Sequence, residues 1–184
     1  MSMSPHVANL RAKVGHDLIV LPSATAVIRD DVGRILLARH ADRDLWVAPG
    51  GAVDPGETPA DAAVRETWEE VGLLVEPVRV LGVFGGPGFE VRYGNGDRTA
   101  YVMIAFECRV LAGTPRPDGE ETQDVGWFTK EEASALPAPA WVRDVFEPPS
   151  RTGFETAPPA LFQPPSWRPD RGSVENDSPG SEAS

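Results

Sequence analysis

The sequence predicts a single mixed α/β domain of the α+β kind. Short runs rich in β-branched and aromatic residues alternate with turn signals through most of the chain. One well-delimited amphipathic helix interrupts these runs at 58–71. The chain has 184 residues, which is enough for one such domain and too short for two full ones.

Composition excludes several kinds of partner. The 28 acidic residues outnumber the 17 basic ones, and the net charge of -11 repels polyanions, so we expect no nucleic-acid partner. No apolar run approaches the roughly 20 residues that cross a bilayer, so we expect no membrane partner. The N-terminus lacks an unbroken apolar stretch, and Cys108 is the only cysteine. A cytoplasmic protein is therefore expected.

Residues 1–20 are expected to form an N-terminal helical extension. Within this range Val7, Leu10 and Val14 recur at helical spacing, and Gly15 is placed to end the helix. The main domain is expected at 21–147.

The last 37 residues, 148–184, hold eight of the 19 prolines together with Ser, Glu and Asp. This composition buries too little apolar surface to offset chain entropy, so a disordered acidic tail is expected. Four large apolar residues leave open the alternative that the tail docks on the domain or on a partner. They are Phe154, Leu161, Phe162 and Trp167.

Turn signals organise the strands of the main domain. Ser23–Arg29 and Ile35–Arg39 flank an Asp-Asp-Val-Gly turn, which predicts a hairpin. Asn95-Gly96 predicts a type I′ turn of a second hairpin. The other predicted strands are Val78–Phe84, Phe89–Tyr93, Tyr101–Val110 and Val125–Phe128.

The helix at 58–71 carries signals at both ends. Thr58 is a good N-cap, Pro59 suits the first helical position, and Asp61 completes a capping box. Gly72 is placed to stop the helix. At about 100° per residue, one side of this helix is predicted to pack and the other to carry acids. The packing side comprises Ala60, Val64, Thr67 and Val71, and the acidic side Glu66, Glu69 and Glu70.

Three carboxylates on one helix face repel one another, and acids in the last turn also oppose the helix dipole. Arg65 can pair with Glu69 four residues on, which relieves one of them. A bound Mg²⁺ would remove the remaining conflict, because it takes carboxylate oxygens as ligands. The alternative is an ordinary solvated acidic face.

The segment before the helix, 48–57, is a glycine-bearing loop that ends in Glu57. Together with Arg65-Glu66-Thr67-Trp68-Glu69-Glu70-Val71-Gly72-Leu73, it resembles the signature of the Nudix hydrolases from Gly51 to Leu73. Thr67 is the one soft departure, because the family usually has an aliphatic residue there. The resemblance implies a mixed β-sheet sandwiched between helices, and a metal-dependent enzyme that uses Mg²⁺, with Mn²⁺ as an alternative.

The resemblance also implies roles for single residues. Glu66, Glu69 and Glu70 would be catalytic metal ligands, and the carbonyl of Gly50 or Gly51 would add another ligand. Glu57 would support the site by binding metal or by holding the loop, and Arg65 by orienting a carboxylate. The general base differs between family members. We expect Glu121, with Glu120 as the second choice, although the segment 118–121 also fits an ordinary acidic turn.

The substrate-binding candidates are Arg39, Phe89 and Arg98. Phe89 or Tyr93 would stack on a base, and Arg92 or Arg98 would meet phosphate, although these residues also fit a solvent-facing hairpin. Trp46 and Trp127 are expected in the core or in a pocket wall. The three histidines show no metal-ligand spacing and are expected to be structural or solvated, and Cys108 is expected to be a small buried apolar residue.

The predicted function is therefore Mg²⁺-dependent hydrolysis of a pyrophosphate bond in a small nucleotide-type substrate. A nucleoside triphosphate and an ADP-ribose-type substrate both remain open. The alternative is a catalytically silent Nudix-fold module that senses or binds a nucleotide. The complete acidic set favours the enzyme, because a pure binder has no need of so many repelling carboxylates. The family is often dimeric, so a homodimer also remains open.

Overall fold

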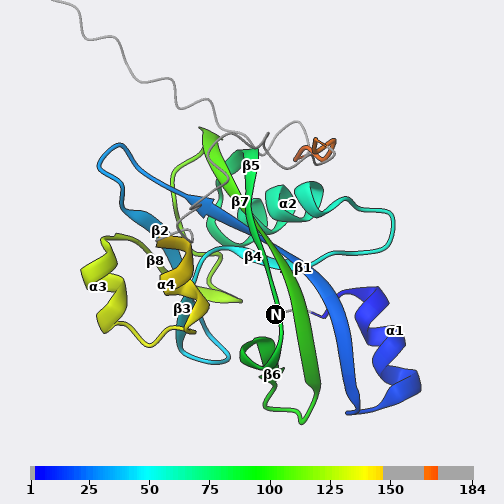
Figure 1. The fold of residues 1–184 in the computed structure, drawn as a ribbon. Coiled ribbons are helices and arrows are strands. Elements are labelled where there is room, and N and C mark those ends of the chain that lie inside the picture. The colour runs from blue at the N-terminus through cyan, green and yellow to red at the C-terminus, as the bar shows by residue number, and fades with distance from the viewer. Residues whose placement is uncertain (1–2, 147–163, 170–184) are drawn as a thin grey trace, which may run out of the picture.

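The computed structural model describes residues 3–146 and 164–169, and their fold is mixed α/β, as predicted (Figure 1). The strands are β1 (Leu18–Ile28), β2 (Ile35–His40), β3 (Leu45–Val47), β4 (Gly50–Ala52), β5 (Leu74–Phe84), β6 (Glu90–Arg92), β7 (Arg98–Ala112) and β8 (Thr122–Phe128). The helices are α1 (Pro5–Val14), α2 (Pro59–Val71), α3 (Lys130–Ala135) and α4 (Trp141–Phe146), with a 3-10 turn η1 (Pro87–Phe89).

The strands form two sheets. The larger has the order β4-β1-β7-β5, with β6 paired to β7, and the smaller has the order β3-β2-β8. In the larger sheet β1 and β7 run parallel, and every other pairing is antiparallel. A mixed sheet is confirmed, but the described strands divide between two sheets rather than one.

The hairpin predicted from 23–29 and 35–39 is wrong. The chain does turn there, since Gly33 N–H donates to the Asp30 carbonyl at 3.0 Å. Beyond one bridge between Arg29 and Ile35, however, the two strands separate into different sheets. β1 takes β7 and β4 as neighbours, whereas β2 takes β8 and β3. β1 from Ser23 to Ile28 and nearly all of β2 are buried, so these segments are placed by packing on both of their faces rather than by the turn between them.

The β6–β7 hairpin is confirmed, but its turn is not type I′. Gly96 has a φ of 94°, whereas Asn95 keeps a negative φ, and a type I′ turn needs positive values at both central residues. Gly96 N–H instead donates to the Tyr93 carbonyl at 2.9 Å. The Asn95 side chain is held by Asp97, with bonds of 2.9 and 3.0 Å. The result is a longer loop that closes with glycine in the left-handed conformation.

The two predicted helices are present. α1 ends at Gly15, and the chain enters β1 at Leu18, inside the range expected for the helical extension. α2 has the predicted N-cap at Thr58 with its capping box, and Gly72 closes it in the left-handed conformation. The short helices α3 and α4 were not predicted, although Thr129 and Glu132 form a capping box at the start of α3.

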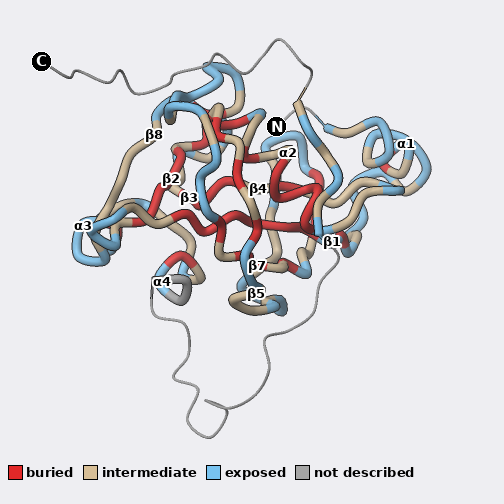
Figure 2. Tube along the Cα trace, turned by 90° about the horizontal axis from the view of Figure 1, so that it is seen from above, coloured by how far each residue is buried: buried red, intermediate tan, exposed pale blue. Residues whose placement is uncertain are grey.

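Two clusters of buried side chains hold the layers together. Figure 2 marks the buried residues in red, and they gather in the middle of the molecule. Ala26 and Phe106, on one face of the larger sheet, pack with α2. Val27 and Met103, on the opposite face, pack with the smaller sheet, α3 and α4. The larger sheet therefore lies between helices, as predicted. Cys108 is buried in the first cluster, and Trp127 and Trp46 pack against the first and second clusters respectively.

Part of the C-terminal region contacts the domain. The Asp61 carboxylate, in the first turn of α2, accepts hydrogen bonds from the main-chain N–H groups of Ser166 and Trp167, both to Oδ1 and the second at 2.8 Å. Trp167 also packs against the first cluster. Docking is therefore confirmed for Trp167, while Phe154, Leu161 and Phe162 lie outside the described residues.

No helix in the described part of the chain is long and apolar enough to cross a membrane.

Candidate active site

The acidic face of α2 places its three carboxylates at different depths. Glu70 is buried at 1% exposure, and the Glu66 side chain is 14% exposed. Glu69 remains half-exposed at 55%. The opposite side of the helix is packed, as predicted, through Ala60, Val64, Thr67 and Val71. Within about one helical turn, the three carboxylates therefore range from half-exposed to fully buried.

The glycine loop approaches two of these acids. The Gly50 N–H donates to Glu70 Oε2 at 3.0 Å. A Cβ atom added to Gly51 would lie 2.2 Å from Glu66 Oε1, closer than any side chain tolerates. Because glycine has no side chain, the Glu66 carboxylate can occupy the space beside position 51.

Arg65 organises the remaining acids. Its guanidinium donates to Glu57 Oε1 at 2.8 Å and lies 2.9 Å from Glu66 Oε1 and 3.1 Å from Glu69 Oε2. Glu57 also accepts the N–H of Asp54 at 2.9 Å, which ties it to the loop. In this arrangement Arg65 contacts three carboxylates, and Glu57 is tied to both Arg65 and the loop.

Burial sets the protonation of the acids. It raises the pKa of Glu66 to about 7, against the opposing effect of Arg65. Burial also raises the pKa of Glu70 well above its ordinary value, and the charge of Glu66 adds to the shift. These carboxylates are therefore costly to ionise unless a cation is near.

Glu70 has an unexpected neighbour in His40. The His40 Nε2 atom lies 3.5 Å from Glu70 Oε1, and both side chains are only 2% exposed. Neither atom has a hydrogen-bond partner among the described residues. Burial foremost, and then the charge of Arg43, lowers the pKa of His40, so the imidazole is neutral near pH 7.

The donor set suits a hard divalent cation. Carboxylate oxygens from Glu66, Glu69 and Glu70 lie beside the loop that contains Gly51, and Glu70 Oε1 is a buried oxygen without a partner. Within residues 3–146 and 164–169, no three His, Cys, Asp or Glu side chains are already arranged around one metal position. Arg65 contacts Glu66 through Oε1 and Glu69 through Oε2, so each of these acids has a second oxygen that the Arg65 contact does not use.

A second acidic segment, 118–121, contributes to the lining of the same cavity. Asp118 Oδ1 accepts the N–H groups of Glu120, Glu121 and Thr122 at 2.8–3.0 Å. The Thr122 hydroxyl donates to the Glu70 carbonyl at 2.7 Å. Glu120, Glu121 and the acids of α2 line one cavity of about 600 Å³. The segment is therefore attached to the end of α2 and not a separate surface turn.

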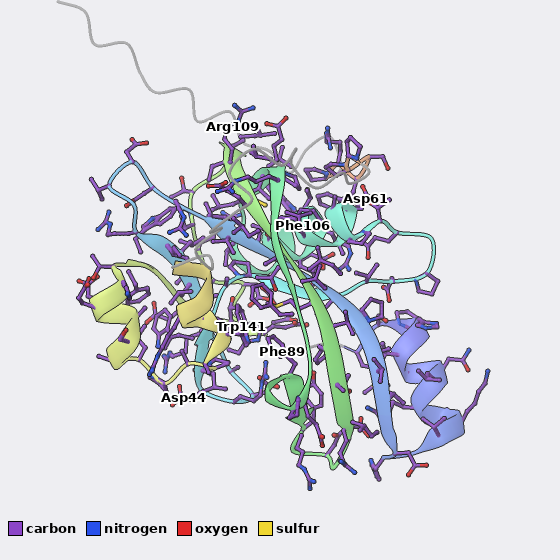
Figure 3. All side chains as sticks on the ribbon, in the orientation of Figure 1. Asp44, Asp61, Phe89, Phe106, Arg109 and Trp141 are labelled. Atoms are coloured by element: carbon purple, nitrogen blue, oxygen red, sulfur yellow. The ribbon has the colours of Figure 1, made fainter. Side chains whose placement is uncertain are left out.

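A second cavity of about 380 Å³ adjoins the first, and its walls are more aromatic. Phe89 and Trp141 line it, and Figure 3 shows both at the same side of the sheet. Tyr93 and Tyr101 line both cavities, and their hydroxyl oxygens lie 2.6 Å apart. The Arg43 guanidinium lies 6.0 Å from the centre of the Tyr93 ring. This second cavity offers flat apolar surface and a cation next to the acidic one.

The structure gathers some of the predicted site residues and not others. Glu57, Arg65, Glu66, Glu69, Glu70 and Glu121 come together with the Gly51 loop, and Phe89 lines the adjoining cavity. Arg39 pairs with Asp44, and Arg98 pairs with Glu90. Neither arginine lines either of these cavities in the described structure, so neither is placed to meet a substrate there.

Sequence reasoning missed three residues with a part in the site: His40, Arg43 and Thr122. In the sequence, His40 follows a short predicted strand and Arg43 lies in the loop after it, and neither has the spacing of a ligand. Thr122 follows the acidic segment directly, and that position was the one signal for it.

Comparisons with known proteins agree with this geometry. A family model described as the NUDIX domain matches residues 20–147. A MutT-like protein of Streptomyces ambofaciens is 38% identical over 111 residues, which cover 60% of this chain and 64% of that protein. A protein of Bacillus subtilis named as a putative 8-oxo-dGTP diphosphatase is 33% identical over 106 residues, covering 58% of this chain and 64% of that protein. The match therefore spans less than two thirds of either relative. The crystal structure of a MutT protein from Methanosarcina mazei superposes with a TM-score of 0.60 and 26% identity, covering 71% of this chain and 93% of that one.

Proposed function

Because the chain belongs to the Nudix hydrolase family, we propose that it is a Mg²⁺-dependent pyrophosphohydrolase that cleaves a nucleoside diphosphate linked to another group. The observation that carries the proposal is Glu70, a buried carboxylate with one oxygen held by Gly50 and the other without a partner. A catalytically silent binding module has no need of such a group.

The three acids of α2 and the Gly51 carbonyl would hold the metal. Bound there, Mg²⁺ or Mn²⁺ would supply neutralisation of phosphate charge and a lower pKa for a coordinated water. Arg65 would hold Glu66 and Glu69 in position while the substrate is absent. Glu57 would keep the loop in place through Asp54.

Glu121 is our choice for the group that accepts the proton of the attacking water, with Glu120 second. Both residues line the cavity of Glu66 and Glu70, and Asp118 fixes the main chain of both. A base that lines the same cavity as the acids of α2, on a segment fixed by main-chain hydrogen bonds, would take the proton of a water bound there.

The aromatic cavity would hold the nucleoside. Phe89 offers a ring for stacking, and Arg43 replaces Arg39 and Arg98 as the cation near the phosphates. The two tyrosines shared by the cavities would lie where the base compartment meets the diphosphate compartment.

A substrate panel tests the proposal. Nucleoside triphosphates, ADP-ribose, NADH and dinucleoside polyphosphates are assayed with Mg²⁺, with Mn²⁺ and with no divalent metal. Turnover is expected only with metal. Glu70→Gln should lower kcat by at least about 100-fold with an unchanged circular dichroism spectrum. Glu131→Gln, a matched change on the exposed first turn of α3, should keep wild-type turnover.

Two results would overturn the proposal. Turnover of Glu70→Gln at the wild-type rate would remove the metal-site assignment. Failure of the wild-type chain to hydrolyse any member of the panel with either metal, while it still binds nucleotides, would favour the sensing module instead.

A further inference from the structure

The main chain around His40 is fixed on both sides. The pairing of β2 with β8 shifts register just before His40, which lies opposite Thr122. The His40 carbonyl accepts the Asp44 N–H at 3.0 Å, and the following N–H, of Ala41, donates to the Glu121 carbonyl at 2.9 Å. Because a bulge of this kind re-aims a side chain, the direction of the imidazole is set by the sheet and by the turn that follows it.

His40 reaches Glu70 from outside the acidic cavity. It lines the second, aromatic cavity, as does Gly50. Glu66, Glu69 and Glu70 line the first cavity, and among the described residues none of these three acids lines the second. The imidazole therefore contacts Glu70 from a side that the other two acids do not share, which suits an orienting group better than a metal ligand.

The contact brings together two polar atoms that lack partners. Glu70 Oε2 accepts the Gly50 N–H at 3.0 Å, whereas Glu70 Oε1 and His40 Nε2 are both buried without a hydrogen-bond partner in the described part of the chain. These two atoms lie 3.5 Å apart. A buried polar atom is costly to leave unpaired, and an N–H···O bond measures about 2.7–3.2 Å. An approach of about 0.5 Å would therefore pair both atoms.

Only one placement of the imidazole hydrogen makes this contact favourable. A carboxylate that holds a cation accepts hydrogen bonds and donates none, so the hydrogen has to be on Nε2. A hydrogen on Nδ1 alone would leave two lone pairs opposite each other. With the hydrogen on Nε2, Gly50 holds one oxygen of Glu70 and His40 holds the other, which fixes the plane of the carboxylate. Each oxygen keeps a lone pair for a cation.

We propose that His40 is a positioning residue of the acidic site, which donates from Nε2 to Glu70 Oε1 and so fixes this carboxylate for the cation. The inference rests on the proposed function, because it takes Glu70 as a metal ligand. Removal of a hydrogen-bond partner from a metal ligand typically lowers metal affinity about 10–100-fold.

His40→Phe tests the donor. The phenyl ring fills most of the space of the imidazole but has no N–H, so Mn²⁺ should bind about ten-fold more weakly. His40→Gln places an amide donor near the position of Nε2 and should recover most of the affinity. Isothermal calorimetry with Mn²⁺, on the protein without substrate, measures the dissociation constants. His6→Phe makes the same change at an exposed position of α1 and should keep the wild-type affinity.

Nuclear magnetic resonance locates the hydrogen in the chain with His40 intact. Long-range ¹H–¹⁵N correlation spectra of the Mg²⁺-loaded protein, with ¹⁵N in its histidine rings, distinguish a hydrogen on Nε2 from one on Nδ1. His6→Gln and His16→Gln, at exposed positions, assign the His40 signal by elimination, so this measurement does not need a His40 variant to fold. A hydrogen on Nε2 is expected.

Three results would overturn the inference. They are wild-type Mn²⁺ affinity in His40→Phe, an affinity of His40→Gln as low as that of His40→Phe, and a hydrogen on Nδ1 alone. The last result also covers a direct bond from Nε2 to the metal, which needs Nε2 without a hydrogen. The two proposals fail separately. These results would leave hydrolysis by the wild-type chain untouched, whereas absence of hydrolysis across the substrate panel, with Mn²⁺ binding that still depends on His40, would remove the enzyme assignment alone.

Discussion

The Thr122 side-chain hydroxyl donates a hydrogen bond to the main-chain carbonyl of Glu70 across 52 residues of sequence, at 2.7 Å. Thr122 is fully buried, and the bond joins the acidic segment to the last turn of α2. This hydroxyl therefore links the two acidic parts of the cavity, together with the main-chain bond from Arg116 N–H to the Val71 carbonyl at 3.0 Å.

Thr122→Val keeps the shape of the side chain and removes this bond. The buried carbonyl of Glu70 then lacks its partner, which should lower the free energy of unfolding by about 1–3 kcal/mol. It should also lower kcat more than it raises KM, because Glu121 loses its fixed position. Denaturant titration and steady-state kinetics measure the two effects. Thr122→Ser retains the hydroxyl and should recover most of both, and a serine variant as impaired as the valine variant would contradict this role.

Gly51→Ala should abolish metal binding with little loss of secondary structure. The added Cβ would lie 2.2 Å from Glu66 Oε1, so the carboxylate must leave the position it holds beside the loop. Isothermal calorimetry with Mn²⁺ reports the loss. Gly85→Ala is the control, since its Cβ would meet only an ordinary contact with the Tyr101 carbonyl at 3.5 Å. Wild-type affinity for Mn²⁺ in Gly51→Ala would show that Glu66 is not a ligand.

The metal-free protein should become less stable as the pH rises from about 4.5 to 7. Burial raises the folded-state pKa of Glu66 to about 7 from an ordinary 4.5, so the folded state holds this proton more tightly than the unfolded state does. The stability that this group contributes is complete below its unfolded pKa and is lost as the pH rises through its folded pKa. The loss amounts to about 3 kcal/mol, and Glu70 acts in the same direction.

Urea titrations at several pH values, with and without Mg²⁺, measure this slope. Mg²⁺ should flatten it, and so should Glu66→Gln. The lowered pKa of His40 gives the opposite dependence below its ordinary 6.5, within the same pH range, and the lowered pKa values of Asp61 and Asp97 give it at lower pH. The contribution of Glu66 is therefore the difference between the wild-type chain and Glu66→Gln, and identical pH slopes in these two metal-free proteins would contradict the buried placement of Glu66.

Trp167→Ala should destabilise the domain by about 1–2 kcal/mol while leaving kcat within a few-fold. The change removes a half-buried ring from the cluster around α2, on the side of the helix away from the acids. Thermal unfolding and steady-state kinetics measure the two effects. Arg168→Ala, at the exposed neighbouring position, is the control. A large loss of activity in Trp167→Ala would instead mean that the docked segment controls the position of the catalytic helix.

Local signals explain which parts of the fold were predictable. Thr58, Asp61 and Gly72 specify both ends of α2 within a few residues, so the helix follows from the sequence alone. The turn after Ile28 is also specified by nearby residues, but the strands with which β1 and β2 pair are not. β1 pairs with β7, about 80 residues later, and no turn residue encodes that choice.

The site shows the same division. The spacing of Glu66, Glu69 and Glu70 along one helix could be predicted from the sequence. Their different degrees of burial depend on Gly50 and on the fold around it. Arg39 and His40 are neighbours in β2, and successive side chains of a strand point to opposite sides. Arg39 pairs with Asp44 while His40 is buried beside Glu70, a difference that depends on which face of β2 meets α2.

The buried position of Cys108 gives the protein a built-in reporter of opening. The residue is the only cysteine, lies on β7 opposite both Ile28 and Pro77, and has its pKa raised by burial. A thiol reagent can therefore modify the native chain only when the centre of the larger sheet separates. The labelling rate of the unmodified protein measures the free energy of that separation, and its response to Mg²⁺ shows how strongly the metal site is coupled to the sheet beneath it.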